Sequence, residues 1–235
     1  YSQVVLKSGS YGTRLALLYA HMYPQSIIRS MISAVNPPGG MAWSTEIVDL
    51  KLQQFAQLCQ QDSYCSSRTD DLLQSLRNAF KEVPSHWLNI AIDPDKVKVA
   101  LFNGLYQTEM AAANFDMIID AENGDYAGFA MMSFAYDYMF ADALIWGDSM
   151  LKAATADFTK EVEAADYSNK NSVIGSPMMQ LALPMWSALR EMNIPMIPEK
   201  YRSALSSDVT TLAINGDLDV ATPVEVLKER QMPYM

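Results

Sequence analysis

The first residues that could take part in catalysis lie in the stretch Ser8-Gly9-Ser10-Tyr11-Gly12, near the beginning of the chain. A serine nucleophile at a sharp strand-to-helix turn needs small residues two positions before and after it, because the backbone is strained there. Gly12 meets this requirement, and Ser8 stands where glycine is usual. The pattern predicts Ser10 as a nucleophile and the backbone N–H of Tyr11 as an oxyanion donor. The alternative is an ordinary strand-to-helix turn.

A second candidate is the acidic loop in the segment LAINGDLDVATP, which follows a short apolar run near the end of the chain. In one class of hydrolases the triad order is serine, acid, histidine, and the acid follows a later strand. Asp217 and Asp219 both lie in this loop. Either one is also a possible cap for the helix expected after Pro223, but Thr222 is better placed as its N-cap. We therefore expect Asp219 to be free for another role.

The elements that must position these residues form an interrupted α/β arrangement. QVVLKSG has the character of a strand, TRLALLYAHMY has helical spacing, and IIRSMISAV resembles a second buried strand, which together predict a βαβ unit and a parallel sheet. The pattern is helical from Met41 to about Leu205, and sheet character returns at residues 209–216. Helices are expected at 46–60, 69–83, 94–107, 110–124, 125–144 and 178–192. We expect a hydrolase-like core over 1–38, a helical cap over 39–205 and the core again over 206–235.

Composition excludes two classes of protein. The 235 residues carry a formal net charge of −10, so the chain lacks the clustered cations that nucleic-acid binding needs. The longest apolar stretch is interrupted by Asp137 and Asp142, whereas a membrane-spanning helix needs about 20 nearly uncharged residues. Neither nucleic acid nor a membrane is therefore an expected partner.

The two cysteines, Cys59 and Cys65, lie six positions apart. No second pair of metal ligands accompanies them, so a zinc site is not expected. A disulfide that closes a short turn between helices and a pair of free thiols both remain open on this spacing.

Two segments resemble the α/β-hydrolase peptidases of the proline iminopeptidase and tripeptidyl aminopeptidase family. They are SGSYGTRLALLYAHMYPQSIIRSMISAVNPP and SSDVTTLAINGDLDVATPVEV, with a Ser-Tyr-Gly-Thr turn, a Pro-Pro pair and a Gly-x-x-Asp-x-x-Thr-Pro loop. The segment FAQLCQQDSYCSSRTDDL resembles the start of that family's cap, where a closely spaced cysteine pair recurs. The resemblance implies an α/β-hydrolase fold with a partial parallel sheet and a large helical cap. It also implies Ser10 as nucleophile, Asp219 as triad acid, a Cys59–Cys65 disulfide and no metal or organic cofactor.

The family's catalytic histidine follows the acid loop, and neither histidine of this chain fits that role. His21 lies eleven residues after Ser10 on the same expected helix, about 16 Å along it, which is too far for a general base. His86 lies in the expected cap, where we interpret it as a surface or packing residue; the less favoured alternative is that it substitutes as the base. The histidine and the family's glycine-rich oxyanion loop are therefore expected outside this chain. Tyr1 opens directly into a strand, which also indicates a fragment or a trimmed product.

The function expected is that of a serine exopeptidase releasing residues from peptide N-termini. Alternatives are a carboxylesterase or lipase-like hydrolase acting on esters, and an inactive fragment or binding module. An incomplete sheet predicts self-association or pairing with complementing segments. A disulfide would favour a secreted or periplasmic protein, and free thiols a cytoplasmic one.

Two further groups of residues have a possible part in substrate binding. The methionine-rich aromatic run from Phe129 to Trp146 either lines an apolar cavity or, as we favour, forms the core of the cap. Carboxylates of the cap are candidates for pairing with a substrate amine, or they form a solvated helix face; they are Glu109, Asp116, Asp120 and Glu122.

Overall fold

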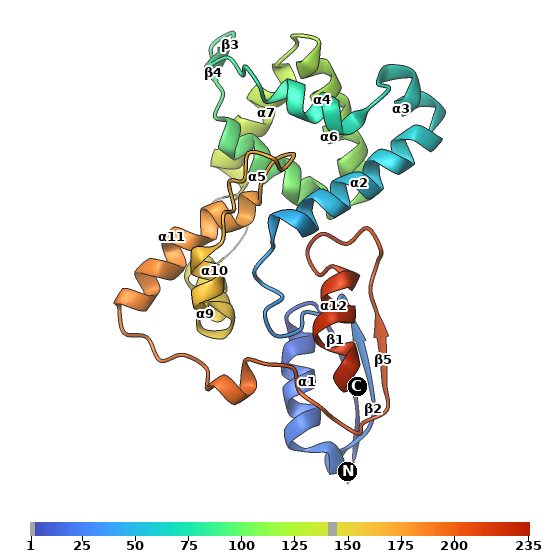
Figure 1. The fold of residues 1–235 in the computed structure, drawn as a ribbon, viewed down its shortest axis with the longest axis vertical. Coiled ribbons are helices and arrows are strands. Elements are labelled where there is room, and N and C mark those ends of the chain that lie inside the picture. Colours follow the sequence, from blue (N-terminus) through green and yellow to red (C-terminus); the bar gives the residue numbers. More distant parts are fainter. Residues whose placement is uncertain (1–2, 141–144) are drawn as a thin grey trace. The chain divides into compact units, whose positions relative to one another are not determined.

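The computed structural model describes residues 3–140 and 145–235, which fold into two compact units (Figure 1). Unit 1 comprises Tyr1–Ala42, Met150–Ala165 and Pro184–Met235, and unit 2 comprises Trp43–Ser149 and Asp166–Leu183. Residues 150–165 and 184–205, which we expected in the cap, therefore group with the sheet. One reason is a buried ion pair, described below, that joins Asp157 to Arg14.

Unit 1 contains a parallel sheet of three strands, β1 (Val4–Gly9), β2 (Ile27–Ser33) and β5 (Thr211–Ile214), in the order β1-β2-β5. Helix α1 (Gly12–Met22) connects β1 to β2, so the predicted βαβ unit is confirmed. Helix α12 (Val224–Arg230) follows β5. The described residues thus form a mixed α/β protein with a small parallel sheet.

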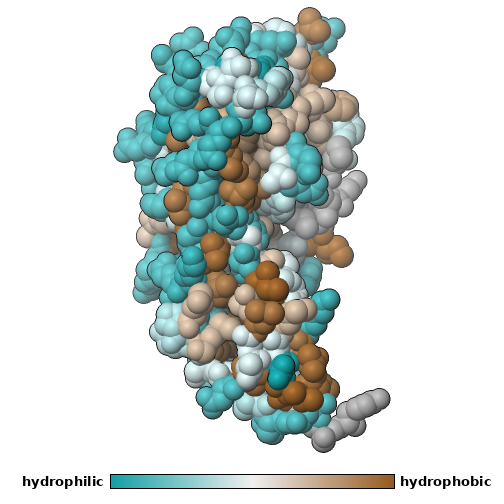
Figure 2. Space-filling view, turned by 90° about the vertical axis from the view of Figure 1, so that its right-hand side faces the viewer, coloured by the Kyte–Doolittle hydropathy of each residue, from teal (hydrophilic) through white to brown (hydrophobic). Residues whose placement is uncertain are grey.

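One face of this sheet is covered and the other is not. Ala16 and Leu17 of α1 and Leu227 of α12 pack with Ile32 and Val35 in a buried cluster. Side chains on the opposite face remain exposed, with Val5 at 64%, Leu212 at 57% and Ile214 at 49%. Figure 2 shows hydrophobic residues gathered over the lower part of the view, at the height of the sheet in Figure 1. Parallel sheets usually have both faces covered, so this face is unusual.

The remaining elements of unit 1 are short or are shared with unit 2. They are η1 (Pro24–Ser26), α10 (Lys160–Ala164), η3 (Glu199–Tyr201) and η4 (Met232–Tyr234). Helices α9 (Trp146–Asp157) and α11 (Pro177–Glu191) each contribute residues to both units. The division of α11 falls at Pro184, whose ring removes one backbone hydrogen-bond donor from the helix.

Unit 2 is predominantly helical, as expected. Its helices are α2 (Thr45–Gln61), α3 (Ser63–Arg68), α4 (Leu72–Ala79), α5 (Pro94–Gly104), α6 (Thr108–Glu122) and α7 (Ala127–Ala135), followed by the π-helix η2 (Tyr136–Phe140). A hairpin of β3 (His86–Trp87) and β4 (Ile90–Ala91) was not expected. Residues 141–144 of the helix predicted over 125–144, Asp142 among them, lie outside the described residues.

Aspartate and serine side chains begin several of these helices. Ser44 accepts from the Ile47 N–H at the start of α2, and Asp62, Asp71 and Asp93 cap α3, α4 and α5. The aromatic run is partly core, because Phe129 is fully buried against the rings of Phe80 and Tyr126. Among the described residues, no helix has the length and apolar character needed to cross a membrane.

Candidate functional site

Ser10 lies at the turn between β1 and α1, and its backbone is left-handed, with φ of 51°. Such a conformation is uncommon for a residue with a side chain and costs about 1–3 kcal/mol unless its surroundings hold it. The Ser10 N–H donates to the carbonyl of Ser33 at the end of β2, at 3.0 Å. The Ser10 residue is exposed. The turn therefore combines a strained backbone with an accessible hydroxyl.

The side chain of Thr13 supports this turn from its buried side. Its fully buried hydroxyl donates to the Ser10 carbonyl at 2.6 Å and accepts from the Asn36 N–H at 2.9 Å. One side chain thus connects the turn to the segment that follows β2. We did not single out Thr13 from the sequence, although it is the threonine of the Ser-Tyr-Gly-Thr pattern.

Small residues surround the turn, as the elbow interpretation requires. A Cβ atom placed on Gly12 would meet the Ser8 Cβ at 3.7 Å, and one placed on Gly9 would meet the Ser33 hydroxyl oxygen at 3.4 Å. Ser8 is therefore accommodated where glycine was expected. The buried Ser8 hydroxyl oxygen has no hydrogen-bond partner within the described part of the chain.

The N-terminus of α1 is not capped by a side chain. Tyr11 occupies the N-cap position with helical backbone angles, and the first helical bonds run from Thr13 N to Ser10 O and from Arg14 N to Tyr11 O. The N–H groups of Tyr11 and Gly12 precede these bonds, and helix starts leave such donors without intrahelical partners. An anionic oxygen at the turn would be favoured by these donors and by the helix dipole.

The acid loop differs from our expectation in one respect. Asp219 accepts from the N–H groups of Ala221 and Thr222 at 2.8 and 2.9 Å, and the Thr222 hydroxyl donates to its second oxygen at 2.6 Å. The N-cap of α12 is Pro223, so the predicted N-cap role of Thr222 is wrong. The Thr222 hydroxyl instead donates to Asp219, three residues earlier, and α12 begins without a side-chain cap.

These bonds orient the Asp219 carboxylate but leave part of its hydrogen-bonding capacity free, because an ionised carboxylate has about four acceptor positions. Asp219 accepts these three hydrogen bonds, two on its first carboxylate oxygen and one on its second. Asp217 lies beside it and accepts from the Leu218 N–H at 3.0 Å. The loop thus presents an oriented carboxylate.

Asn215 ties the acid loop to the neighbouring strand. Its side-chain oxygen accepts from the Val35 N–H at 3.0 Å, and its amide donates to the Thr222 carbonyl at 2.7 Å. Sequence reasoning missed this residue, because an asparagine after a strand is equally typical of an ordinary turn.

Ser10 and the acid loop lie at the same edge of the sheet. Both follow the carboxyl ends of parallel strands, and only β2 separates β1 from β5. Neighbouring strands are about 4.8 Å apart, so the two strand axes are about 10 Å apart. A histidine side chain can form a hydrogen bond of about 2.6–3.2 Å with each of its two ring nitrogens. Such an imidazole is of suitable size to bridge Ser10 and the acid loop across this distance.

Neither histidine occupies that position in unit 1. The His21 Nδ1 atom lies 2.8 Å from the carbonyl oxygen of Ser206, which precedes β5 at the edge where the strand begins. That edge is opposite to Ser10. His86 belongs to unit 2, where its ring contacts the Ser85 hydroxyl at 3.1 Å.

A buried ion pair positions the helix of the turn. Arg14 forms hydrogen bonds with both carboxylate oxygens of Asp157, at 2.7 and 2.9 Å, and also donates to Asn36 and to the Pro37 carbonyl. Asp157 accepts in addition from the N–H groups of Gly39 and Met41. A charged residue on the buried face of α1 was a signal that a partner exists, but its identity was not predictable.

The candidate carboxylates of unit 2 have protein partners. Asp116 and Asp120 pair with Arg68, and Glu122 accepts from Asn78 at 2.7 Å. Glu109 accepts from the Thr108 hydroxyl at 3.3 Å. These contacts agree better with a structural surface network than with free receptors for a substrate amine.

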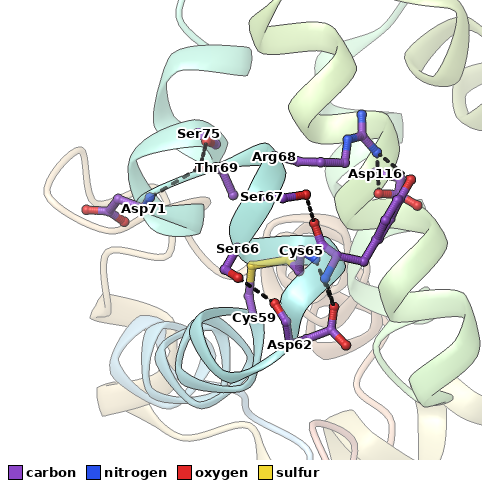
Figure 3. The surroundings of a disulfide bond; sticks show 11 residues. Cys59, Asp62, Cys65, Ser66, Ser67, Arg68, Thr69, Asp71, Ser75 and Asp116 are labelled. Atoms are coloured by element: carbon purple, nitrogen blue, oxygen red, sulfur yellow. Dashed lines mark hydrogen bonds and ion pairs between the residues drawn. A yellow bond between two sulfur atoms is a disulfide. The ribbon is translucent and has the colours of Figure 1, made fainter.

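The cysteine pair is bonded, as the resemblance implied. Cys59 near the end of α2 and Cys65 in α3 form a disulfide (Figure 3). Asp62 lies between them and accepts from the N–H groups of Tyr64 and Cys65 at 3.0 and 2.8 Å. The turn between the two helices is thus held both covalently and by a cap.

Within residues 3–140 and 145–235, no group of three or more His, Cys, Asp and Glu side chains is arranged to hold a metal ion. Comparison with models of known protein families and with curated proteins finds no match to the chain.

Proposed function

We propose that the protein is a serine hydrolase in which Ser10 is the nucleophile and Asp219 orients a catalytic histidine. The observation that carries this proposal is the left-handed backbone of Ser10 at an exposed strand-to-helix turn. Strain of this kind persists only where surrounding contacts hold it, and it clusters at active sites. The resemblance of the two segments to α/β-hydrolase peptidases points to the same residues.

The proposed mechanism assigns a role to each group. The histidine, supplied from outside residues 1–235, removes the Ser10 proton as the hydroxyl attacks the substrate carbonyl. The N–H of Tyr11 donates to the oxyanion that forms, and Asp219 holds the imidazole and favours its charged form. Thr13 positions the turn through its bond with the Ser10 carbonyl, at 2.6 Å.

We propose an exopeptidase acting on free peptide N-termini as the activity, on the strength of the resemblance alone. The second reading is an esterase with the same triad, and the third is an inactive or binding module. They differ in what they hydrolyse, so substrate choice separates them. Peptide or aminoacyl p-nitroanilides with free and with acetylated amines test the first, and p-nitrophenyl esters test the second.

The first experiment uses the longest natural form of the protein that contains residues 1–235. We expect a fluorophosphonate probe to label Ser10, and we expect Ser10→Ala to lower turnover by roughly 10⁴-fold or more. Mass spectrometry of the labelled peptides locates the adduct. A label on another residue, or no label on folded protein, would remove Ser10 as nucleophile.

Ser10→Gly separates chemistry from folding. Glycine adopts positive φ at no steric cost, so this variant should be as stable as the natural protein or more stable by about 1 kcal/mol. It should nevertheless be unlabelled and inactive. A clear loss of stability would contradict the strained turn on which the proposal rests.

A further inference from the structure

Unit 2 contains a groove of about 570 Å³ that has no part in the proposed hydrolase site. Its lining residues come from α4 and the two residues after it, from one residue of α5, and from α11 and the loop before it, elements that are labelled in Figure 1. Sites for small organic ligands usually have volumes of about 300–1,000 Å³. The groove is therefore large enough for a ligand.

The charges of the residues that line the groove are all of one sign. Arg77, Lys81, Lys98 and Lys170 contribute cations, and no aspartate or glutamate is among the lining residues. The whole chain has 17 basic and 27 acidic residues. A groove lined by four cations and no acid thus differs from the chain as a whole, in which acidic residues outnumber basic ones.

Three of these cations have no carboxylate partner in the described parts of the chain. Other basic residues of the protein form ion pairs, for example Arg68, Lys96 and Arg190. Arg77, Lys81 and Lys170 form none. Lys98 meets Asp95 at 3.4 Å and lies over the ring of Phe80, 5.7 Å from its centroid. The positive charge of the groove is therefore not neutralised from within.

The C-terminus of α4 explains the position of only two of the four cations. Cations are favoured near a helix C-terminus, which accounts for Arg77 in the last turn of α4 and for Lys81 just beyond it. Lys98 and Lys170 come from α5 and from the loop before α11. Their convergence needs another reason.

The loop that carries Lys170 has a defined shape. The carboxylate of Asp49 accepts from the Ser172 hydroxyl at 2.8 Å and from the Val173 N–H at 2.9 Å, and the Ser172 oxygen accepts from the Gly175 N–H at 3.0 Å. Gly175 has φ of 74°, which glycine alone adopts readily. The loop therefore presents Lys170 from a fixed backbone.

The groove also has an apolar floor. Val173 and Ile174 are 8% and 4% exposed, and Phe80 is half-buried beside them. Among the described residues, five acids contact lining residues of the groove without lining it themselves: Asp49, Asp71, Asp95, Glu122 and Asp166. All of these except Asp95 accept from hydroxyl, amide or backbone donors, so Arg77, Lys81 and Lys170 remain the cations available to an anion.

We propose that this groove binds a small organic anion carrying at least two negative charges on phosphate or carboxylate groups. The three unpaired cations neutralise the charges through charge-assisted hydrogen bonds. The carbon part of the ligand lies on Phe80, Val173 and Ile174. This site is separate from the proposed hydrolase chemistry and does not depend on it.

Isothermal titration calorimetry with inorganic pyrophosphate and with citrate tests the proposal at low ionic strength. We expect the natural protein to bind at least one probe with a stoichiometry of one, and added salt to weaken binding. Stronger binding of pyrophosphate identifies phosphate as the preferred group, and stronger binding of citrate identifies carboxylate. Binding of neither probe would overturn the proposal.

The triple variant R77Q/K81Q/K170Q should lose affinity by at least about tenfold, since it removes the three unpaired charges. Its matched control is K160Q/K200Q/K228Q, which changes three exposed lysines of unit 1 and alters net charge by the same amount. The control should bind within about twofold of the natural protein. Equal losses in the two variants would show that binding follows net charge and not the groove. Circular dichroism of both variants confirms that they are folded.

Discussion

Each unit of the molecule contains an arginine paired with aspartate, and the two pairs are in very different environments. In unit 1, the side chains of Arg14 and Asp157 are 9% and 0% exposed. In unit 2, Arg68 is 24% exposed, and its partners Asp116 and Asp120 are 40% and 49% exposed. Breaking a buried ion pair lowers stability more than breaking an exposed one, because the remaining charge is left in the interior without its partner. Water and salt screen the exposed pair, which therefore contributes little.

The partners around each arginine show the same difference. Asp157 also accepts two backbone N–H groups, so removing its charge affects the loop after β2 as well as Arg14. Burial of the Arg68 guanidinium lowers its pKa. The negative charges of Asp116 and Asp120 outweigh this effect, so the pKa of Arg68 lies above its ordinary value. The unit 1 pair is an organising centre, whereas the unit 2 cluster is a surface feature beside the disulfide (Figure 3).

The largest effect is expected from Asp157→Asn. This variant leaves Arg14 charged and buried, and it should lower the free energy of unfolding by about 3–5 kcal/mol. Urea denaturation followed by circular dichroism measures the change. Asp208→Asn, at an exposed position of unit 1, is the matched control and should change stability by less than about 0.5 kcal/mol. A loss below about 1 kcal/mol in Asp157→Asn would contradict the comparison.

The disulfide should have an intermediate effect, confined to unit 2. A bridge that closes a loop of this length, with a sequence separation of 6, stabilises by about 2 kcal/mol through the entropy of the unfolded chain. The double variant C59S/C65S should therefore melt at a lower temperature than the oxidised protein. The measurement is differential scanning calorimetry, with reduced natural protein as the control.

Thiol titration checks the premise of that experiment. Denatured protein that has not been reduced should contain no free cysteine, because both cysteines are bonded. Two titratable thiols would exclude the bridge in the isolated protein and the expectation of an oxidising compartment with it.

The smallest effect is expected from Arg68→Gln, which removes the exposed pairing with Asp116 and Asp120. The loss should be about 1 kcal/mol or less, and it should shrink further at high salt. Urea denaturation at low and high ionic strength, run beside Asp157→Asn, measures both variants. A loss from Arg68→Gln equal to that from Asp157→Asn would mean that burial does not distinguish the two sites.

Local patterns in the sequence were sufficient for several features. The alternation before Ser10, the helical spacing after it and the next apolar run predicted β1, α1 and β2, since each depends on neighbouring residues. The two small residues around Ser10 predicted a tight turn, and its left-handed φ agrees with that prediction. Periodicity predicted helices that overlap α2, α4, α5, α6 and α7, whereas the short helix α3, which Asp62 caps, was not predicted. The roles of Ser10 and Asp219 in catalysis stay predictions.

Only the tertiary structure decided which distant residues meet. Arg14 and Asp157 are 143 positions apart, and nothing in the sequence near either one distinguishes this partner among the acids of the chain. The basic groove joins residues of three separate segments, each unremarkable by itself. By contrast, the Thr222 hydroxyl donates to Asp219, a carboxylate only three residues earlier, which is a local contact. Short-range forces determine helices and turns, but the pairing of charges depends on how the whole chain packs.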